Sequence, residues 1–519
     1  MATFTVSTTN DAGAGSLRQA IIDANGTPGS TVDFNLPNNS TITLISQIQI
    51  TSNMTIINNN PSTIIVSGGG TTRIFLISAP SPVVSITNLT LRDGFTNADG
   101  AAINNSGILT INNCVITNNN ANGGFGAGIY NTLPGNVTLN YCTISDNQST
   151  ANGAGLHNDN GSIMAVNNST ISGNIITTLL FVLGAGIYNG ISSSLTVLNS
   201  TFNGNVGFNG SGLYNTGTLT MTNSTVSGNG HTDTSIGIGG GVSNVGTATL
   251  NNTIVALNFA ESDPDISGNF SLSSGYNLIG DVGGSTGITD GVNGNIVGVN
   301  PLLNPLANYG GPTLTMSLQF GSPAIDVGNN ALVPPGTLFD QRGPGFPRII
   351  NGTVDIGAIE AALACYSGKS LILTRNKLTG EIAEIQAKNV YADTHEVFDT
   401  VNQIFIPIKL NIVAGLTTRY VKIKKNSLGE NMPNADFYVT SGHKIIINGF
   451  EIKAKYIPNT KRIKVKPENI YSICTENRTS IKVNGLNVIA WGYDEWMEKS
   501  SKRGLGWKNN KQEQYDNKY

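Results

Sequence analysis

The amino-acid sequence predicts an all-β protein in which a long parallel β-solenoid precedes a second, smaller all-β domain. Three observations predict this fold class. A glycine-centred motif recurs every 26 to 31 residues between Gly100 and Asn244. A short run of alternating polar and apolar residues follows each copy. The first lysine of the 519-residue chain is Lys369, so the composition changes sharply and indicates a domain boundary near Glu360.

Each copy of the repeated motif indicates one coil of the solenoid. The run 219–229 is typical, because its period of two predicts strands and its Asn and Gly residues predict turns. Strands and turns that alternate at this spacing predict a parallel β-solenoid. The six copies of the motif begin at Gly100, Gly126, Gly153, Gly184, Gly210 and Gly239.

Asparagines recur in three columns along the repeats. Strands of adjacent coils lie ~4.8 Å apart, so identical side chains stack and their amides can bond along the stack. Cys114 and Cys142 occupy equivalent positions of neighbouring coils. We interpret them as small residues that point inward, with a disulfide or a metal site as the alternatives. The columns are Asn105, Asn131, Asn158, Asn189, Asn215 and Asn244; then Asn119, Asn147, Asn174, Asn205, Asn229 and Asn258; then Asn113, Asn168, Asn199, Asn223 and Asn252, which Tyr141 interrupts.

A helix is predicted at the N-terminal end of the solenoid. Ser16 is a candidate N-cap with Gln19 three residues later. We expect the helix to cover the open end of the coils. Its apolar face consists of Leu17, Ala20, Ile21 and Ala24.

The first 360 residues resemble the bacterial secreted proteins that carry a choice-of-anchor Q domain. The resemblance implies a right-handed β-helix with a closing module, and it implies no activity. The motifs that carry it are Ser16-Leu-Arg-Gln-Ala-Ile, Gly275-Tyr-Asn-Leu-Ile-Gly-Asp, Gly298-Val-Asn-Pro, Asn308-Tyr-Gly-Gly-Pro-Thr, Gly321-Ser-Pro-Ala-Ile-Asp, Asp340-Gln-Arg-Gly and Asp355-Ile-Gly-Ala-Ile-Glu.

We therefore divide the chain into five parts. These are an N-terminal cap (1–30), a parallel β-helix (31–270), a closing module (271–360), a second domain (361–493) and a flexible polar tail (494–519). Residues 1–360 hold five of the 29 Lys and Arg residues but 17 of the 32 Asp and Glu residues. The lysines of the second domain are spread through alternating strands, which indicates solvated faces and no nucleic-acid partner.

The solenoid itself offers little catalytic chemistry. Its five arginines lie outside the repeating coils, and Asp263 and Asp265 are expected to cap a turn. Tyr130, His157, Tyr188 and Tyr214 form a column that alternation places outward. This column either binds sugar rings or stabilises the sheet through cross-strand pairing. A carbohydrate-binding or carbohydrate-cleaving β-helix is therefore the competing class, and a cluster of carboxylates on one face of the solenoid would distinguish it.

The second domain resembles the Hedgehog/intein (Hint) autoprocessing family. Cys365 opens the domain, Thr440 and His443 form a Thr-x-x-His pair, and the runs 470–474 and 481–490 match late strands of that family. The resemblance implies that Cys365 attacks the carbonyl of Ala364 to give a thioester. It further implies that Thr440 polarises the scissile amide and that His443 protonates its nitrogen.

Departures from the family pattern limit this reading. Ile489-Ala490 stands where an intein has His-Asn, so no asparagine can cyclise and splicing is excluded. Ser472 stands where many inteins carry Asp. We expect Cys474 to be a core residue and His395 to be structural. The alternative for the whole domain is a catalytically dead Hint fold that serves as a cap or assembly aid.

The sequence thus predicts a β-helical surface or fibre protein, adhesin-like in character, with a C-terminal domain that cleaves itself once and needs no cofactor or metal. A polysaccharide or cell-surface ligand and a homo-oligomer are the expected partners. No Sec signal peptide or membrane span is visible in the sequence, and no disulfide framework is expected from four cysteines. A virion or an extracellular surface is the favoured location.

Overall fold

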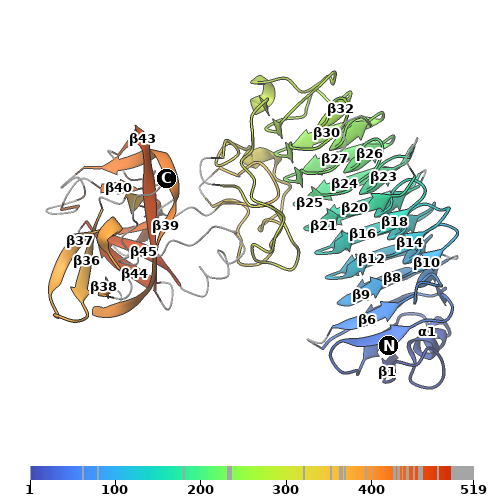
Figure 1. Ribbon diagram of the computed structural model, residues 1–519. Helices are drawn as coiled ribbons and strands as arrows, with labels where there is room; N and C mark the ends of the chain where they lie inside the picture. Colours follow the sequence, from blue (N-terminus) through green and yellow to red (C-terminus); the bar gives the residue numbers. More distant parts are fainter. Residues whose placement is uncertain are drawn as a thin grey trace, which may run out of the picture. The chain divides into compact units, whose positions relative to one another are not determined.

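The protein folds into two compact units, which are described separately (Figure 1). The first holds residues 1–318 and 322–360, and the second begins at Ala361. The computed structural model describes residues 2–492 except for short gaps at 61–62, 79–80, 160, 179–181, 231–236, 320–321, 351–352, 362–365, 368–369, 392–393, 401, 425–427, 429–432, 435–436, 440–443, 448–449, 454–456, 458–459, 476–478 and 485. The predicted polar tail, 494–519, lies outside the described residues.

The first unit is a right-handed parallel β-solenoid, so the predicted fold class is confirmed. Successive coils contribute one strand each to sheets that run along the solenoid (Figure 1). Sheet A contains β1 (Thr3–Val6), β2 (Ser30–Phe34), β5 (Met54–Ile57), β8 (Val83–Thr87), β12 (Ile108–Asn112), β16 (Asn136–Asn140), β20 (Ile163–Asn167), β24 (Ser194–Leu198), β27 (Thr218–Thr222) and β30 (Thr247–Asn251).

Two further long sheets complete the wall of the solenoid. Sheet B contains β3 (Ser40–Thr43), β6 (Ile64–Ser67), β9 (Leu89–Arg92), β13 (Val115–Thr117), β17 (Thr143–Ser145), β21 (Thr170–Ser172), β25 (Thr201–Asn203), β28 (Thr225–Val226), β31 (Ile254–Val255), β33 (Leu278–Ile279) and β34 (Ile296–Val297). Sheet C contains β4 (Ile48–Ile50), β7 (Phe75–Ile77), β11 (Ile103–Asn105), β15 (Ile129–Asn131), β19 (Leu156–Asn158), β23 (Ile187–Asn189), β26 (Leu213–Asn215), β29 (Val242–Asn244) and β32 (Ile266–Gly268). The short sheet D contains β10 (Phe95–Thr96), β14 (Asn120–Ala121), β18 (Gln148–Ser149) and β22 (Ile175–Ile176).

The period-two pattern of the strands builds one continuous core. In β12, Leu109 and Ile111 point inward and are buried, whereas Ile108, Thr110 and Asn112 point outward. The same alternation in each coil stacks Ile, Val and Leu side chains from Val6 to Ile288 into a single cluster. Cys114 and Cys142 are buried free thiols in this stack, as predicted, and burial raises the pKa of Cys114 to about 12.

Two of the three asparagine columns form the predicted amide ladders. Along the column that begins at Asn105, each Nδ2 donates to the Oδ1 of the next coil at 2.7–2.9 Å. Along the column that begins at Asn119, the same bonds measure 2.8–2.9 Å. Asp265 ends the second ladder by accepting from Asn258 at 2.8 Å, which confirms its predicted structural role.

The third column was predicted to be a ladder as well, and this was wrong. Asn113, Asn168, Asn199, Asn223 and Asn252 have φ between 47° and 53°, a left-handed conformation that Asn tolerates better than most residues. They therefore form the tight turn between sheets A and B. The Nδ2 groups of Asn168, Asn199 and Asn252 donate to backbone carbonyls of Asp340, Phe339 and Asn329.

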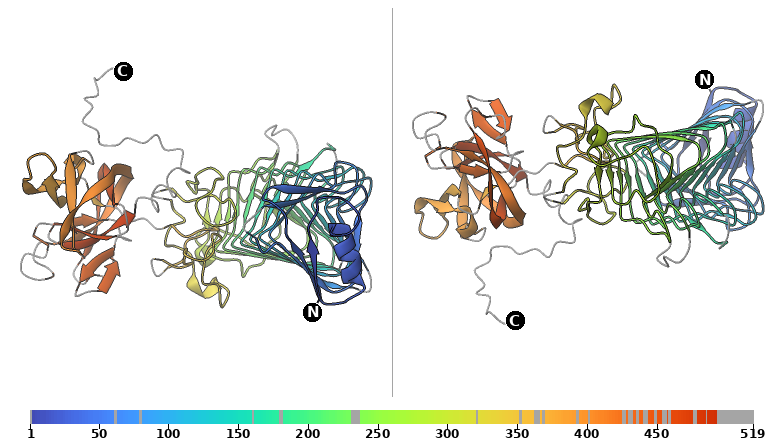
Figure 2. Two further views of the ribbon diagram at one scale, coloured as in Figure 1. Left: turned by 90° about the horizontal axis from the view of Figure 1, so that it is seen from below. Right: turned by 90° about the horizontal axis from the view of Figure 1, so that it is seen from above.

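A helix covers the N-terminal end of the solenoid, as predicted (Figure 2). This helix, α1 (Leu17–Asn25), has Ser16 as its N-cap, which accepts from the backbone N–H of Gln19 at 3.2 Å. The predicted apolar face is buried and packs against β1, β2 and β4.

The last 60 residues of the first unit run back along sheet B in irregular loops, which include the short 3₁₀ helix η2 (Asn330–Leu332); η1 (Val292–Gly294) precedes them. Gln341 is fully buried, and its Nε2 donates to the backbone oxygens of Leu314 and Ser169 at 2.9 and 3.3 Å. Ala358 N donates to Thr225 Oγ1 at 3.0 Å. These bonds hold the closing module against the turns that the third asparagine column forms.

The second unit is an eleven-stranded, almost entirely antiparallel sheet that folds around its own core. Its elements are β35 (Tyr366–Ser367), β36 (Leu371–Asn376), β37 (Ile382–Gln386), η3 (Ala387–Asn389), β38 (His395–Asp399), β39 (Ile404–Ile423), β40 (Phe437–Val439), β41 (Lys444–Ile447), β42 (Phe450–Lys453), β43 (Lys461–Thr475), β44 (Thr479–Val483) and β45 (Leu486–Gly492).

Candidate functional site

The strand that opens the second unit lies in the middle of its sheet. β35 pairs antiparallel with β40 on one side and with β43 on the other. Tyr366 is opposite Val439 in β40 and opposite Tyr471 in β43. The start of the domain is therefore beside the end of β40 and beside the middle of the long strand β43.

The four residues that the sequence nominated for cleavage, Ala364, Cys365, Thr440 and His443, lie outside the described residues. Cys365 directly precedes β35, and Thr440 directly follows β40 in the chain. Phe437 and Val439 of β40 are fully buried, which anchors this strand in the core. The roles of the four residues remain predictions.

His395 has a structural environment, as predicted. Its side chain is 8% exposed, and burial lowers the pKa of the imidazole. Its Nδ1 lies 3.3 Å from the backbone N of Tyr391 and 2.9 Å from Thr394 Oγ1. These contacts hold the imidazole in its own turn through Nδ1, which fits a structural role. Cys474 lies in β43, opposite Leu410 and beside Trp491.

The aromatic column on sheet C stacks on itself. His157 and Tyr188 have ring centroids 4.7 Å apart, and Tyr188 and Tyr214 are 6.0 Å apart with nearly parallel planes. Tyr130 lies on the other side of His157 and donates from its hydroxyl to Asp159 Oδ2 at 2.8 Å. Because each ring covers the face of the next, the geometry favours the stabilising interpretation of this column over sugar stacking.

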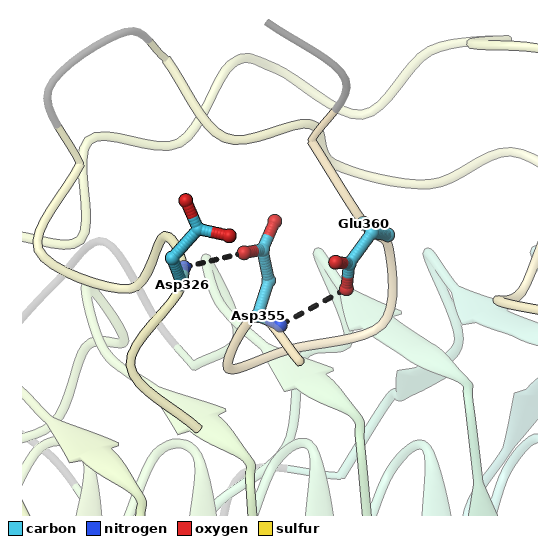
Figure 3. Close-up of side chains that lie close together, drawn as sticks. All are labelled: Asp326, Asp355 and Glu360. Atoms are coloured by element: carbon cyan, nitrogen blue, oxygen red, sulfur yellow. Dashed lines mark hydrogen bonds between the residues drawn. The ribbon is translucent and has the colours of Figure 1, made fainter. Parts of the chain in front are cut away.

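A cluster of three acidic side chains lies in the closing module (Figure 3). Carboxylate oxygens of Asp326, Asp355 and Glu360 lie within 4.8 Å of one another. The backbone N–H of Asp326 donates to Asp355 Oδ1 at 2.6 Å, and that of Asp355 donates to Glu360 Oε2 at 2.9 Å. Among the described residues, this is the one group of three or more acid, histidine or cysteine side chains close enough to share an ion.

Arg348 supplies the positive charge that this cluster needs. Its guanidinium is 1% exposed and donates to Glu360 Oε2 at 3.3 Å, to the carbonyl of Asp355 at 3.3 Å and to the carbonyl of Gly357 at 3.0 Å. Burial raises the pKa of Glu360 to about 7, although Arg348 and two backbone N–H groups act in the opposite direction. Arg348 and Glu360 thus form a buried ion pair that holds a loop together, and Asp326 is the half-buried member of the cluster.

A second buried ion pair adjoins it. Arg342 Nη2 donates to the carboxylate of Asp340 and, at 2.8 Å, to the backbone carbonyl of Glu360. Asp340 Oδ2 in turn accepts from the backbone N–H of Glu360 at 2.8 Å. The backbone and the side chain of Glu360 are therefore both held inside the first unit.

Sequence reasoning did not assign a role to these residues. Asp340, Arg342, Asp355 and Glu360 belong to motifs that carry the choice-of-anchor Q resemblance, and Arg348 is one of the five arginines of the first 360 residues. One signal could have found them. In a region without lysine, two arginines that lie close in sequence to acidic residues indicate specific ion pairs.

Comparisons with known proteins find one family model and several solved structures. A family model described as a right-handed beta helix region matches residues 74–259. A search of curated proteins finds no match. Among solved structures, pectate lyase Pel9A matches with a TM-score of 0.40 and 13% identity, covering 69% of this chain and 96% of its own. A DnaB intein from Synechocystis matches with a TM-score of 0.19 and 15% identity over 25% of this chain and 99% of its own. The ORF18 protein of Geobacillus virus E2 matches with a TM-score of 0.25 and 13% identity over 48% of this chain and 59% of its own.

In the part of the chain that the structure describes, no helix has the length and apolar character needed to cross a membrane. The family match covers the coils that carry both complete asparagine ladders.

Proposed function

We propose that residues 361–493 form a self-cleaving domain of the Hint kind, which breaks the Ala364–Cys365 bond and separates the β-helix from the domain that follows it. The observation that carries this proposal is the pairing of β35 with β40 and β43. The β-helix is then a stable surface or fibre element, and the second unit acts once.

The strand register supports the choice of residues. In an antiparallel pair, a step back along one strand matches a step forward along the other. Tyr366 is opposite Val439, so one further step of the same register would put position 365 opposite position 440. Tyr366 is also opposite Tyr471, so the same step would put position 365 opposite Ser472. Thr440 and Ser472 thus each directly follow, in the chain, a residue that lies opposite Tyr366.

The proposed reaction needs no cofactor. The Cys365 thiolate attacks the carbonyl carbon of Ala364, the bond from that carbon to the Cys365 nitrogen breaks, and the nitrogen leaves as an amine that His443 protonates. Thr440 donates a hydrogen bond to the scissile carbonyl oxygen. Water then hydrolyses the thioester, which gives a carboxylate on Ala364 and regenerates the thiol. The chain has Ile489-Ala490 where splicing needs His-Asn, so cleavage is the expected end of the reaction.

Intact-mass spectrometry of freshly purified full-length protein tests this proposal. We expect two fragments that meet between Ala364 and Cys365, and faster release with hydroxylamine or an added thiol because both intercept a thioester. Cys365→Ala should abolish cleavage, and Cys474→Ala is the matched control that should leave it intact. Wild-type protein that stays full length for days under added thiol would leave the dead-cap alternative.

The acidic cluster found among the described residues gives the competing proposal, a carbohydrate-cleaving β-helix, little support. This cluster lies in the closing module, where Arg348 and backbone N–H groups engage it. Carbohydrate binding without cleavage does not require this cluster.

A further inference from the structure

One side chain of each strand in sheet A stacks into an unbroken outward column, here called the threonine column. The pairings between neighbouring strands put its ten members in register across all ten strands of the sheet. Eight of the ten are threonine and one is serine. In order along the solenoid, they are Thr3, Thr31, Thr55, Ser85, Thr110, Thr138, Ala165, Thr196, Thr220 and Thr249.

The hydroxyls of this column are open to solvent. All ten residues are exposed or half-buried, whereas their neighbours Leu109, Val137 and Leu195 are buried. The structure records no hydrogen bond from these nine hydroxyls to any residue that it describes. Each hydroxyl offers one donor and two acceptor lone pairs, so the column presents a row of unused hydrogen-bonding groups that Ala165 interrupts once.

The side chains that flank the column differ in polarity between its two sides. On one side, Asn140 Nδ2 donates to Asn112 Oδ1 at 2.9 Å and Asn167 Nδ2 donates to Asn140 Oδ1 at 3.0 Å. On the other side, Val83, Ile108 and Ile163 are 51%, 45% and 51% exposed. In β12, β16 and β20, the threonine column is therefore flanked on one side by three hydrogen-bonded amides. On the other side, it is flanked by Ile108, Asn136 and Ile163, and polar residues continue this row through the later coils.

The face carries almost no charge. Among the outward-pointing side chains of the ten strands, the one ionisable group is Asp33 of β2. Surfaces designed for solubility aim for about 25–35% charged residues, so a whole sheet face with a single ionisable group is strongly depleted in charge. A partner that matches it electrostatically is neutral and offers hydroxyls and apolar CH groups.

The spacing of the column further restricts the partner. Strands lie ~4.8 Å apart, so ten strands span about 43 Å along the solenoid axis. A sugar ring in an extended β-1,4-linked chain advances by slightly more than the spacing of one strand, so over a few coils successive rings lie over successive members of the column. We propose that the outward face of sheet A binds a neutral, extended β-1,4-linked polysaccharide that lies along the solenoid axis.

Each contact in such a complex is weak, and the number of repeats makes the binding measurable. One hydroxyl contributes little by itself, but tethered contacts that form together multiply. The proposal involves the first unit alone, so it stands or falls independently of self-cleavage.

Co-sedimentation of the full chain with microcrystalline cellulose and with chitin tests the proposal. The test variant carries Thr110→Val, Thr138→Val, Thr196→Val and Thr220→Val, which keep the β-branched shape and remove the hydroxyl. The matched control carries Thr41→Val and Thr90→Val, two half-buried threonines of sheet B. We expect wild type and control to be retained, and the test variant to lose retention by at least about tenfold. Polygalacturonate, which is charged, and starch, which is α-linked, should not compete.

Several results would overturn the proposal. These are absence of wild-type retention on both polysaccharides, equal losses in the test and control variants, and competition by polygalacturonate or starch as strong as by soluble cello-oligosaccharides. Inhibition of ice recrystallisation without retention on either polysaccharide would indicate that the face binds ordered water and would overturn the proposal. If the valine variant unfolds by circular dichroism, the four Thr→Ser substitutions take its place. They keep the hydroxyls, and loss of retention in that folded variant would also overturn the proposal.

Discussion

In the solenoid, each strand pairs with its equivalent one coil away, whereas in the second unit β36 pairs with β44, more than a hundred residues later in the chain. The first arrangement repeats one local unit, so each position has the same environment in every coil. The second arrangement gives every residue an environment of its own. In the solenoid, one position therefore predicts the environment of its equivalents in the other coils, whereas in the second unit it does not. The structural effect of a single substitution should also extend over different distances in the two units.

The largest expected effect tests chemistry in the second unit against stability in the first. Under the proposed function, His443→Ala should slow cleavage by about a hundredfold or more, because the leaving nitrogen loses its proton donor. The melting temperature of the solenoid should not change. Time courses by intact-mass spectrometry measure the rate, and His395→Ala is the matched control with little expected effect. Equal slowing by both substitutions would mean that the domain had merely lost its fold.

The next effect tests whether the first unit depends on charge as well as on repetition. Arg348→Met should destabilise the closing module by about 3–5 kcal/mol, because it leaves buried carboxylates without their cation. Arg92→Met is the control, since that residue pairs with Asp93 at 40% exposure and should cost less than about 1 kcal/mol. Chemical denaturation monitored by far-UV circular dichroism measures the free energy of unfolding of both variants. Similar costs for the two variants would contradict the structural role of the buried pair.

A third substitution tests how local the solenoid is. Asn189→Leu should cost about 1–3 kcal/mol, because Asn158 and Asn215 each lose a buried amide partner. Asn136→Leu, at an outward position of β16, should cost much less. Thermal melts compare the two, and the cleavage rate should be the same in both. An equally mild effect of Asn189→Leu would show that the ladder adds little to the stacked core.

The smallest effect concerns pH. Glu360 has a pKa of about 7 in the folded protein, above its ordinary value of 4.5, because burial disfavours its charge. Folding therefore favours the protonated form, so this contribution to stability is complete below pH 4.5 and is lost as the pH rises through 7. The melting temperature should fall modestly between pH 5 and pH 8. Glu360→Gln keeps the shape without the charge and should flatten that dependence; an unchanged slope would assign the pH effect to other groups.

The repetition explains which features could be predicted from sequence. The Asn105 and Asn119 ladders, the stacked Cys114 and the α1 cap follow from patterns that recur or from local rules, and the structure confirms them. The third column failed because a pattern of equal residues does not reveal backbone conformation. Asn199 recurs for its left-handed φ, and its amide serves a different segment.

The closing module shows why the rest could not be predicted. Arg348 meets Glu360 and Asn199 only because an irregular loop returns along sheet B, and no period in the sequence encodes that return. In the second unit, the partners of β35 come from β40 and β43, which lie about 70 and 100 residues further along the chain. Only a resemblance to a family could nominate such distant partners.

The hydrogen bonds of Glu360 should protect the first unit from exopeptidases. Its N–H is bonded to Asp340, its carbonyl to Arg342 and its carboxylate to Arg348 and two backbone groups. A carboxypeptidase must draw the terminal residue into its own cleft in an extended form, and Glu360 cannot extend without breaking all of these bonds. If the linker after Glu360 is cut at any position, trimming from the new C-terminus should stop at Glu360. The solenoid should then have a single, homogeneous C-terminus.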